Sequence, residues 1–202
     1  MFDLNSIIVI LTIPATAVMA ASAATQAVRF DFDLFGATFL AVITAVGGGT
    51  IRDILIGATP VFWLRDITYL CTAVPVGIIT YLMVARMQGG QGQRFRLLSY
   101  FDAVGLALFT LVGVKVALNA GINPIMAAIL GGITGVGGGM LRDVLCGVTP
   151  TILKSDFYAT LSLIGAALYL FSVPHLGEEI SLASAFALIT VVRIAIVARN
   201  AT

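Results

Sequence analysis

The chain alternates between long apolar runs and short polar connections over almost its whole length. Each run holds about twenty residues with few charges, which is the length that an α-helix needs to cross the roughly 30 Å hydrocarbon core of a bilayer. We therefore expect an all-α integral membrane protein with seven transmembrane helices. The expected spans are residues 5–28, 34–57, 66–86, 98–119, 123–147, 156–173 and 179–198.

Composition narrows the function classes. Of the 202 residues, 59% are apolar and only 10% are charged, whereas about a quarter of a soluble domain is charged. This composition excludes a soluble enzyme and a disordered chain. The net charge of +1 gives no basic surface for nucleic acid. One histidine and two scattered cysteines, Cys71 and Cys146, form no metal cluster and no nucleophile–base pair, so we expect neither an enzyme nor a bound metal or cofactor.

The distribution of Lys and Arg predicts the orientation. Cytoplasmic connections of membrane proteins carry an excess of these residues, and the excess falls on alternate connections if the N-terminus lies outside. The connections that would then be cytoplasmic carry Arg29, Arg86, Arg94, Arg96, Lys154 and Arg199, while the opposite side keeps Arg65. We expect the N-terminus outside and the C-terminus in the cytoplasm.

An internal repeat organises the chain. Residues 47–60 read GGGTIRDILIGATP and residues 137–150 read GGGMLRDVLCGVTP, with 9 of 14 positions identical. The copies lie on the second and fifth spans and therefore cross the membrane in opposite directions. We expect a first three-helix repeat in 1–88, an inner loop in 89–95, a second, inverted three-helix repeat in 96–176, and a C-terminal seventh helix with the tail in 177–202. Inverted repeats are typical of transport proteins.

Each repeat copy begins with three successive glycines in the middle of a span. The two triplets are Gly47, Gly48 and Gly49, and Gly137, Gly138 and Gly139. One interpretation is that glycines kink helices 2 and 5, because loosened backbone is tolerated in a membrane where it lines a polar pathway. The other is close helix packing, because small residues recur every four positions before both triplets. The two are compatible, and we expect Thr44 and Thr134 to face the same pathway.

Four charges follow the glycines at matched positions: Arg52, Asp53, Arg142 and Asp143. A charge near the bilayer centre costs about 2.5 to 3.5 kcal/mol on insertion scales, so these side chains need partners or a wet cavity. Adjacent helical residues point about 100° apart, so each charge is expected to pair across to the other repeat. The charges either set the potential along a pore or form salt bridges that lock the second span to the fifth.

Two further charged residues are candidate site residues, and each has two interpretations. Lys115 lies inside the fourth span and either extends to the outer interface or faces the pathway. Asp102 is expected at the inner end of that span, where it caps the helix or attracts cations at a vestibule.

These motifs resemble those of a known family. The duplicated GGGxxRDxLxG, the DAVGLALF run at 102–109 and the three-plus-three-plus-one layout are similar to the prokaryotic branch of the trimeric intracellular cation (TRIC) channels, a sequence domain that also carries the label glycine transporter. The resemblance implies homotrimers in which each protomer holds an hourglass pore for monovalent cations, chiefly potassium, around kinked helices 2 and 5. It places the glycine triplets and the two Arg–Asp pairs beside that pore. Animal members carry a Lys-Glu-Val motif, but Lys115 is followed by Val116, so regulation through that motif is not implied.

Two function hypotheses follow. The first is a passive, potassium-permeable cation channel of the bacterial inner membrane, with K⁺ or Na⁺ as the permeant ion and modest selectivity, because the sequence has no carbonyl filter of the Thr-Val-Gly-Tyr-Gly type. The alternative is a secondary transporter for a small zwitterion such as glycine, since an Arg–Asp pair can bind both a carboxylate and an ammonium group.

Overall fold

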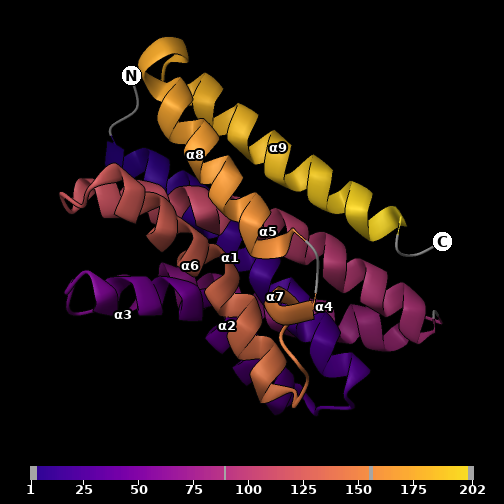
Figure 1. Ribbon diagram of the computed structural model, residues 1–202. Helices are drawn as coiled ribbons and strands as arrows, with labels where there is room; N and C mark the ends of the chain where they lie inside the picture. Colours follow the sequence, from indigo (N-terminus) through magenta and orange to yellow (C-terminus); the bar gives the residue numbers. More distant parts are fainter. Residues whose placement is uncertain (1–3, 89, 155–156, 200–202) are drawn as a thin grey trace.

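The computed structural model describes residues 4–88, 90–154 and 157–199, and these residues fold into helices without a β-strand (Figure 1). The expected starts of the inner loop at 89 and of the sixth span at 156, and both ends of the chain, lie outside this range. The helices are α1 (Leu4–Arg29), α2 (Leu34–Leu55), α3 (Phe62–Arg65), α4 (Thr68–Arg86), α5 (Gln91–Asn119), α6 (Pro124–Leu145), α7 (Thr151–Lys154), α8 (Tyr158–Leu176) and α9 (Glu178–Arg199).

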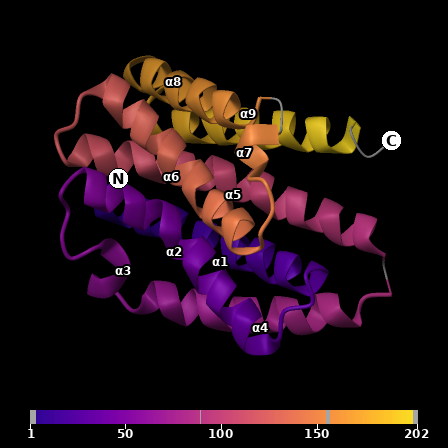
Figure 2. The same ribbon diagram turned by 60° about the horizontal axis from the view of Figure 1, so that its bottom comes forward.

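Seven of the described helices, all except α3 and α7, are long and apolar enough to span a membrane, which confirms the predicted all-α membrane fold. The first repeat contributes α1, α2 and α4, and the second contributes α5, α6 and α8. Helices α1 and α5 pack against each other, as do α2 and α6. Figure 2 shows α8 and α9 together along one edge of the molecule and α4 along the opposite edge. The residues between these edges therefore come from both repeats.

Helices α2 and α6 end in the same way. Gly57 and Gly147 follow the helix ends with φ of +71° and +68°, a left-handed conformation that glycine adopts without steric penalty. The next amide, from Ala58 or Val148, donates to the carbonyl of Asp53 or Asp143 over 2.8 and 3.0 Å. This is the Schellman arrangement that closes a helix. The Gly-x-Thr-Pro part of the repeat motif thus stops both helices, and α3 and α7, which the sequence pattern did not predict, follow directly.

The start of α5 differs from the expectation. The helix begins at Gln91 rather than at 98, so 91–95 form its first turns instead of an inner loop. Gln91, Gln93 and Arg94 are residue types that favour helices although they are polar, so the polar composition of this segment was a poor guide to its structure. One consequence is that Asp102 lies three turns inside α5 and does not cap it.

The glycine triplets lie where α2 crosses α6, and both helices continue through them without a break. A Cβ added to Gly48 would overlap the carbonyl oxygen of Thr134, and a Cβ added to Gly138 would overlap the carbonyl oxygen of Thr44. These reciprocal contacts confirm the close-packing interpretation, because no larger residue fits at either position. A glycine kink of either helix stays a prediction.

Candidate functional site

Two hollows enter the described part of the protein from opposite ends of α1 and α5. The α6 vestibule, about 680 Å³, is lined by Gln26 on α1 and Asp102 on α5 and reaches the Arg142–Asp143 pair of α6. The α2 vestibule, about 250 Å³, is lined by Thr12 and Val112 on the same two helices and reaches the Arg52–Asp53 pair of α2. Because α1 and α5 line both hollows, the two repeat motifs lie at the two ends of one helix pair.

Within each repeat motif the arginine binds the aspartate that follows it. Arg52 donates from Nε and Nη2 to Oδ1 of Asp53 over 2.9 and 2.7 Å. Arg142 donates from the same two nitrogens to Oδ1 of Asp143 over 2.9 and 2.8 Å. The expected pairing between α2 and α6 is therefore wrong. A long guanidinium side chain can fold back onto the next carboxylate and bind it in a fork, even though the two Cβ atoms point apart.

The second carboxylate oxygen of each aspartate anchors the short helix that follows. Oδ2 of Asp53 accepts a hydrogen bond of 2.8 Å from the backbone N–H of Phe62, the first residue of α3. Oδ2 of Asp143 accepts one of 2.8 Å from the backbone N–H of Thr151, the first residue of α7, and another from its hydroxyl. The first N–H groups of a helix have no partner within the helix, so each aspartate satisfies one of them and joins two helices.

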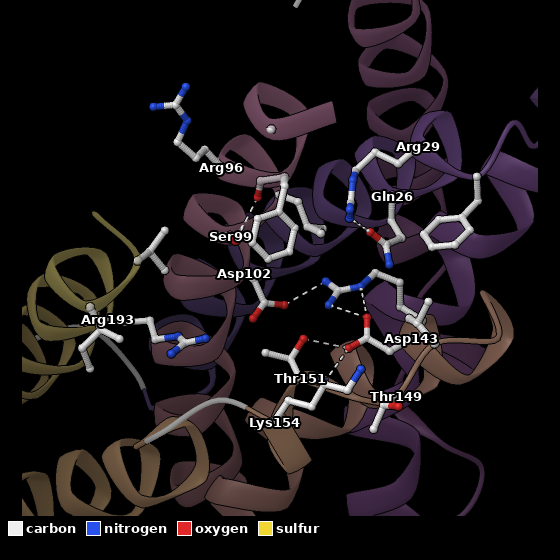
Figure 3. Close-up of a pocket in the computed structure, with 18 residues that line it drawn as sticks. Gln26, Arg29, Arg96, Ser99, Asp102, Asp143, Thr149, Thr151, Lys154 and Arg193 are labelled. Carbon is white, nitrogen blue, oxygen red and sulfur yellow. Dashed lines mark hydrogen bonds and ion pairs between the residues drawn. The ribbon is translucent and has the colours of Figure 1, made fainter. Parts of the chain in front are cut away.

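Arg142 makes further contacts with two other helices. Its Nη1 donates to Oδ1 of Asp102 on α5 over 2.8 Å and to the hydroxyl of Ser22 on α1 over 2.6 Å. The hydroxyl of Tyr158 on α8 donates to Oδ2 of Asp102 over 2.5 Å. Asp102 and Asp143 thus approach one guanidinium from two sides (Figure 3). With two carboxylates and one arginine, this cluster has a net formal charge of −1.

The first repeat carries different residues at the matching places. The repeats are offset by 90 residues, so Asp102 corresponds to Thr12, and Ser22 corresponds to Val112. Thr12 and Val112 both line the α2 vestibule. Among the described residues of the first repeat, Arg52 is bound by the single carboxylate of Asp53, and its guanidinium carbon lies 5.6 Å from the centre of the Phe62 ring. The two repeats therefore place an Arg–Asp pair at matching positions, but the charges around the two pairs differ.

The mouth of the α6 vestibule is basic. Arg29, Arg96 and Lys154 line it, whereas Arg193 is 5% exposed and lies deeper, against the ring of Tyr158 (Figure 3). The guanidinium carbon of Arg29 lies 4.9 Å from the centre of the Phe95 ring, and that of Arg193 lies 4.6 Å from the centre of the Tyr158 ring. An ion entering here meets positive charge first and negative charge deeper in the protein.

The mouth of the α2 vestibule carries both signs of charge, from Arg65 and Asp66. Thr68 hydrogen-bonds to the carboxylate of Asp66 from its side chain and from its backbone N–H, and these bonds lower the pKa of Asp66 below its ordinary value. The carboxylate therefore stays ionised to a lower pH than an ordinary aspartate does.

The other predicted site residues have different surroundings. Gly47, Gly49, Gly137 and Gly139 flank the α2–α6 crossing. The hydroxyl of Thr134 donates to the carbonyl of Leu130 in its own helix over 2.6 Å, whereas the buried hydroxyl of Thr44 has no hydrogen-bond partner among the described residues. Lys115 lines neither vestibule and forms an ion pair with Glu178 at the start of α9. It therefore joins the second repeat to the seventh helix.

Sequence reasoning missed the partners of Arg142. Ser22 and Tyr158 belong to no repeated motif, and Asp102 was expected as a helix cap or as a carboxylate at a vestibule, not as a partner of Arg142. The usable signal was the lone acidic residue at 102 within an otherwise apolar run, since a buried carboxylate in a membrane helix needs a cationic partner.

Comparisons with known proteins agree with this architecture. The family model described as "Glycine transporter" matches residues 9–85 and 99–174. The inner membrane protein YadS of Escherichia coli is 44% identical over 171 residues, which cover 81% of this chain and 80% of YadS.

Solved structures show the same fold. The TRIC trimeric intracellular cation channel orthologue from Rhodobacter sphaeroides matches with a TM-score of 0.90 and 34% identity, covering 96% of this chain and 99% of the other. A prokaryotic TRIC channel crystallised in 0.5 M KCl matches with a TM-score of 0.90 and 32% identity, covering 97% and 98% of the two chains. The chain therefore belongs to the family described as glycine transporter, and it has the fold of the prokaryotic TRIC channels.

Proposed function

We propose that the protein is a passive, potassium-permeable cation channel with one pathway in each protomer. The observation that carries this proposal is that two vestibules approach each other along α1 and α5 from opposite ends, and that each ends at an Arg–Asp pair of the repeat. A pathway past both pairs would cross the protein between its two repeats, where inverted-repeat transport proteins place their sites.

Buried carboxylates supply the preference for cations. The carboxylates of Asp102 and Asp143 lie at the end of the α6 vestibule, and a carboxylate in a region of low dielectric attracts a cation more strongly than it does in water. K⁺ or Na⁺ passes without a cofactor. Selectivity between the two ions is modest, because the carboxylates provide charge without a rigid ring of carbonyl ligands.

The relatives support the assembly and the location. The structural neighbours are described as trimeric cation channels, and the E. coli relative as an inner membrane protein. We extend both properties to this chain as a homotrimer in the bacterial inner membrane. The excess of Lys and Arg on alternate connections supports an outer N-terminus and a cytoplasmic C-terminus.

The test is reconstitution of the purified protein in a planar bilayer under a potassium chloride gradient. We expect unitary currents that reverse near the potassium equilibrium potential. The double variant Asp53→Asn with Asp143→Asn should show lower potassium conductance and a reversal potential closer to zero. The matched control is Glu179→Gln, which removes an exposed carboxylate that lines neither vestibule.

The description of the matching family favours a second candidate function, transport of glycine. An arginine next to a carboxylate offers ligands for both ends of a zwitterion. Uptake of labelled glycine into proteoliposomes separates the two functions. Saturable uptake without unitary currents would replace the channel with a transporter.

A further inference from the structure

We infer that the side chain of Met19 is the apolar barrier that closes the pathway between the two vestibules. This inference rests on the proposed channel function, and it assigns the closure to one residue that the repeat motif does not contain. It follows from the pattern of side chains on α1 and from the space that glycines leave around Met19.

Helix α1 connects the vestibules by one face. Thr12 lines the α2 vestibule and Gln26 lines the α6 vestibule, and their separation of 14 positions corresponds to about 21 Å along the helix. The residues at helical spacing on this face are Thr12, Ala15, Thr16, Met19, Ser22, Ala23 and Gln26. Between the two ends, Met19 is the one long apolar side chain, and its neighbours on the face are small or carry a hydroxyl group.

Met19 projects from α1 into a space that two glycines leave open. A Cβ on Gly105 of α5 would overlap the sulfur of Met19, and a Cβ on Gly138 of α6 would lie 3.3 Å from its methyl carbon. The side chain is 1% exposed and packs against Leu108 and Phe109. Because Gly138 is also the glycine that contacts α2, Met19 lies beside the crossing of the two repeats.

The barrier has polar groups before and after it. One turn toward the α2 vestibule is Thr16, whose buried hydroxyl, like that of Thr44, has no hydrogen-bond partner among the described residues. One turn toward the α6 vestibule is Ser22, which accepts a hydrogen bond from Arg142. A buried hydroxyl without a hydrogen-bond partner costs free energy. If these hydroxyls line a path that fills with water when the barrier moves, water becomes their partner.

Methionine suits a barrier that moves. A short apolar constriction excludes water and ions by dewetting. The unbranched methionine side chain has three rotatable bonds and can leave its position without a backbone shift. Rotation of Met19 away from Gly105 and Gly138 would join the hydroxyls on one side to the Arg142 cluster on the other.

The experiment compares potassium currents of the full-length trimer in planar bilayers. Met19→Ser removes the apolar barrier and should raise the time-averaged current about tenfold. Met19→Leu keeps the apolar volume but loses the unbranched chain, so its current should not exceed that of the wild type. Met126→Ala truncates an exposed methionine on α6 and should change nothing. Thermal unfolding in detergent checks that each variant is folded.

The outcomes separate this inference from the proposed function. If the wild type conducts and folded Met19→Ser conducts equally, the barrier lies elsewhere and the channel function stands. If neither conducts, the channel function fails and this inference fails with it. A conducting Met19→Ser beside a silent wild type supports both.

A second measurement does not depend on a change in conductance. Met19→Cys is introduced together with Cys71→Ala and Cys146→Ala, so that position 19 carries the sole thiol. With potassium nitrate in place of potassium chloride, so that silver stays dissolved, silver ions, which are close to potassium in size, should block the current of this variant from either chamber and leave the cysteine-free background unaffected. Resistance to silver from both chambers in a conducting variant would place position 19 outside the pathway and overturn the assignment.

Discussion

Arg142 donates a hydrogen bond of 2.8 Å from Nη1 to Oδ1 of Asp102, and this contact joins the last turn of α6 to the interior of α5. The first repeat has Thr12 at the position that matches Asp102. One end of the molecule therefore holds an arginine between two carboxylates, and the other holds an arginine beside one. The two ends are related by the repeat but should respond differently to mutation.

Asp102→Asn should destabilise the protein strongly. It leaves the guanidinium of Arg142, which is 1% exposed, with a single carboxylate partner, and breaking a buried ion pair costs about 3–5 kcal/mol. Tyr158→Phe removes one hydrogen bond to the same carboxylate and should cost less, about 1.5–3 kcal/mol. Unfolding in detergent, with Glu179→Gln as the exposed control, measures both effects. Equal stability of Asp102→Asn and wild type would show that the pair is not stabilising.

Gly48→Ala should destabilise the α2–α6 crossing. The new Cβ overlaps a backbone carbonyl oxygen, which cannot move aside as a side chain can, and overpacking typically costs about 1–3 kcal/mol. Gly92→Ala should do the opposite. Gly92 lies in the first turn of α5 with no atom within 4 Å of its added Cβ, and alanine gains about 1 kcal/mol over glycine within a helix. The melting temperature should fall in Gly48→Ala and rise in Gly92→Ala. An unchanged melting temperature in Gly48→Ala would contradict the tight crossing.

Arg96→Gln combined with Lys154→Gln should raise the potassium current that enters through the α6 vestibule. Both side chains are exposed at its mouth, and removing two positive charges raises the local concentration of cations. The gain should shrink as salt is increased, because exposed charges are screened. Current–voltage curves at low and high potassium chloride measure this dependence. A gain that is independent of salt would point to a change in structure instead.

Lys115→Met should weaken the attachment of α9 and leave the ion preference unchanged. Lys115 is 2% exposed and pairs with Glu178, and neither residue lines a vestibule. Removal of one partner leaves the other charge uncompensated, so Lys115→Met and Glu178→Gln should each lower the melting temperature, and their combination should lose less than the sum. A double-mutant cycle measures this coupling. A shifted reversal potential in Lys115→Met would instead place Lys115 on the pathway.

Most of the fold was readable from sequence, because the features that determine it are local or repeated. Twenty-residue apolar runs predicted the seven spans, and the duplicated motif predicted the inverted repeats. The start of α5 was not readable, because residues with strong helix propensity were also polar. The helices α3 and α7 were missed because each has only four residues, too few to show a helical pattern of apolar positions.

The sequence predicted where the candidate site lies but not which residues form its hydrogen bonds and ion pairs. The repeat located Arg52, Asp53, Arg142 and Asp143 at matched places, and the structure places them at the ends of two vestibules. The partners of Arg142 come from residues 40 and 120 positions away in the chain. No periodicity along the sequence encodes such contacts, since they depend on which helices pack side by side.

The reciprocal contact of Gly48 with Thr134 and of Gly138 with Thr44 has a further consequence. Each repeat presents the same surface to the other, as the two subunits of a symmetric dimer do at an isologous interface. A half-length chain carrying one repeat could build the same crossing with a second copy inserted in the opposite orientation. The present chain has the form expected of such a dual-topology dimer after fusion, and a fused chain can carry different residues at matched positions, as Thr12 and Asp102 do.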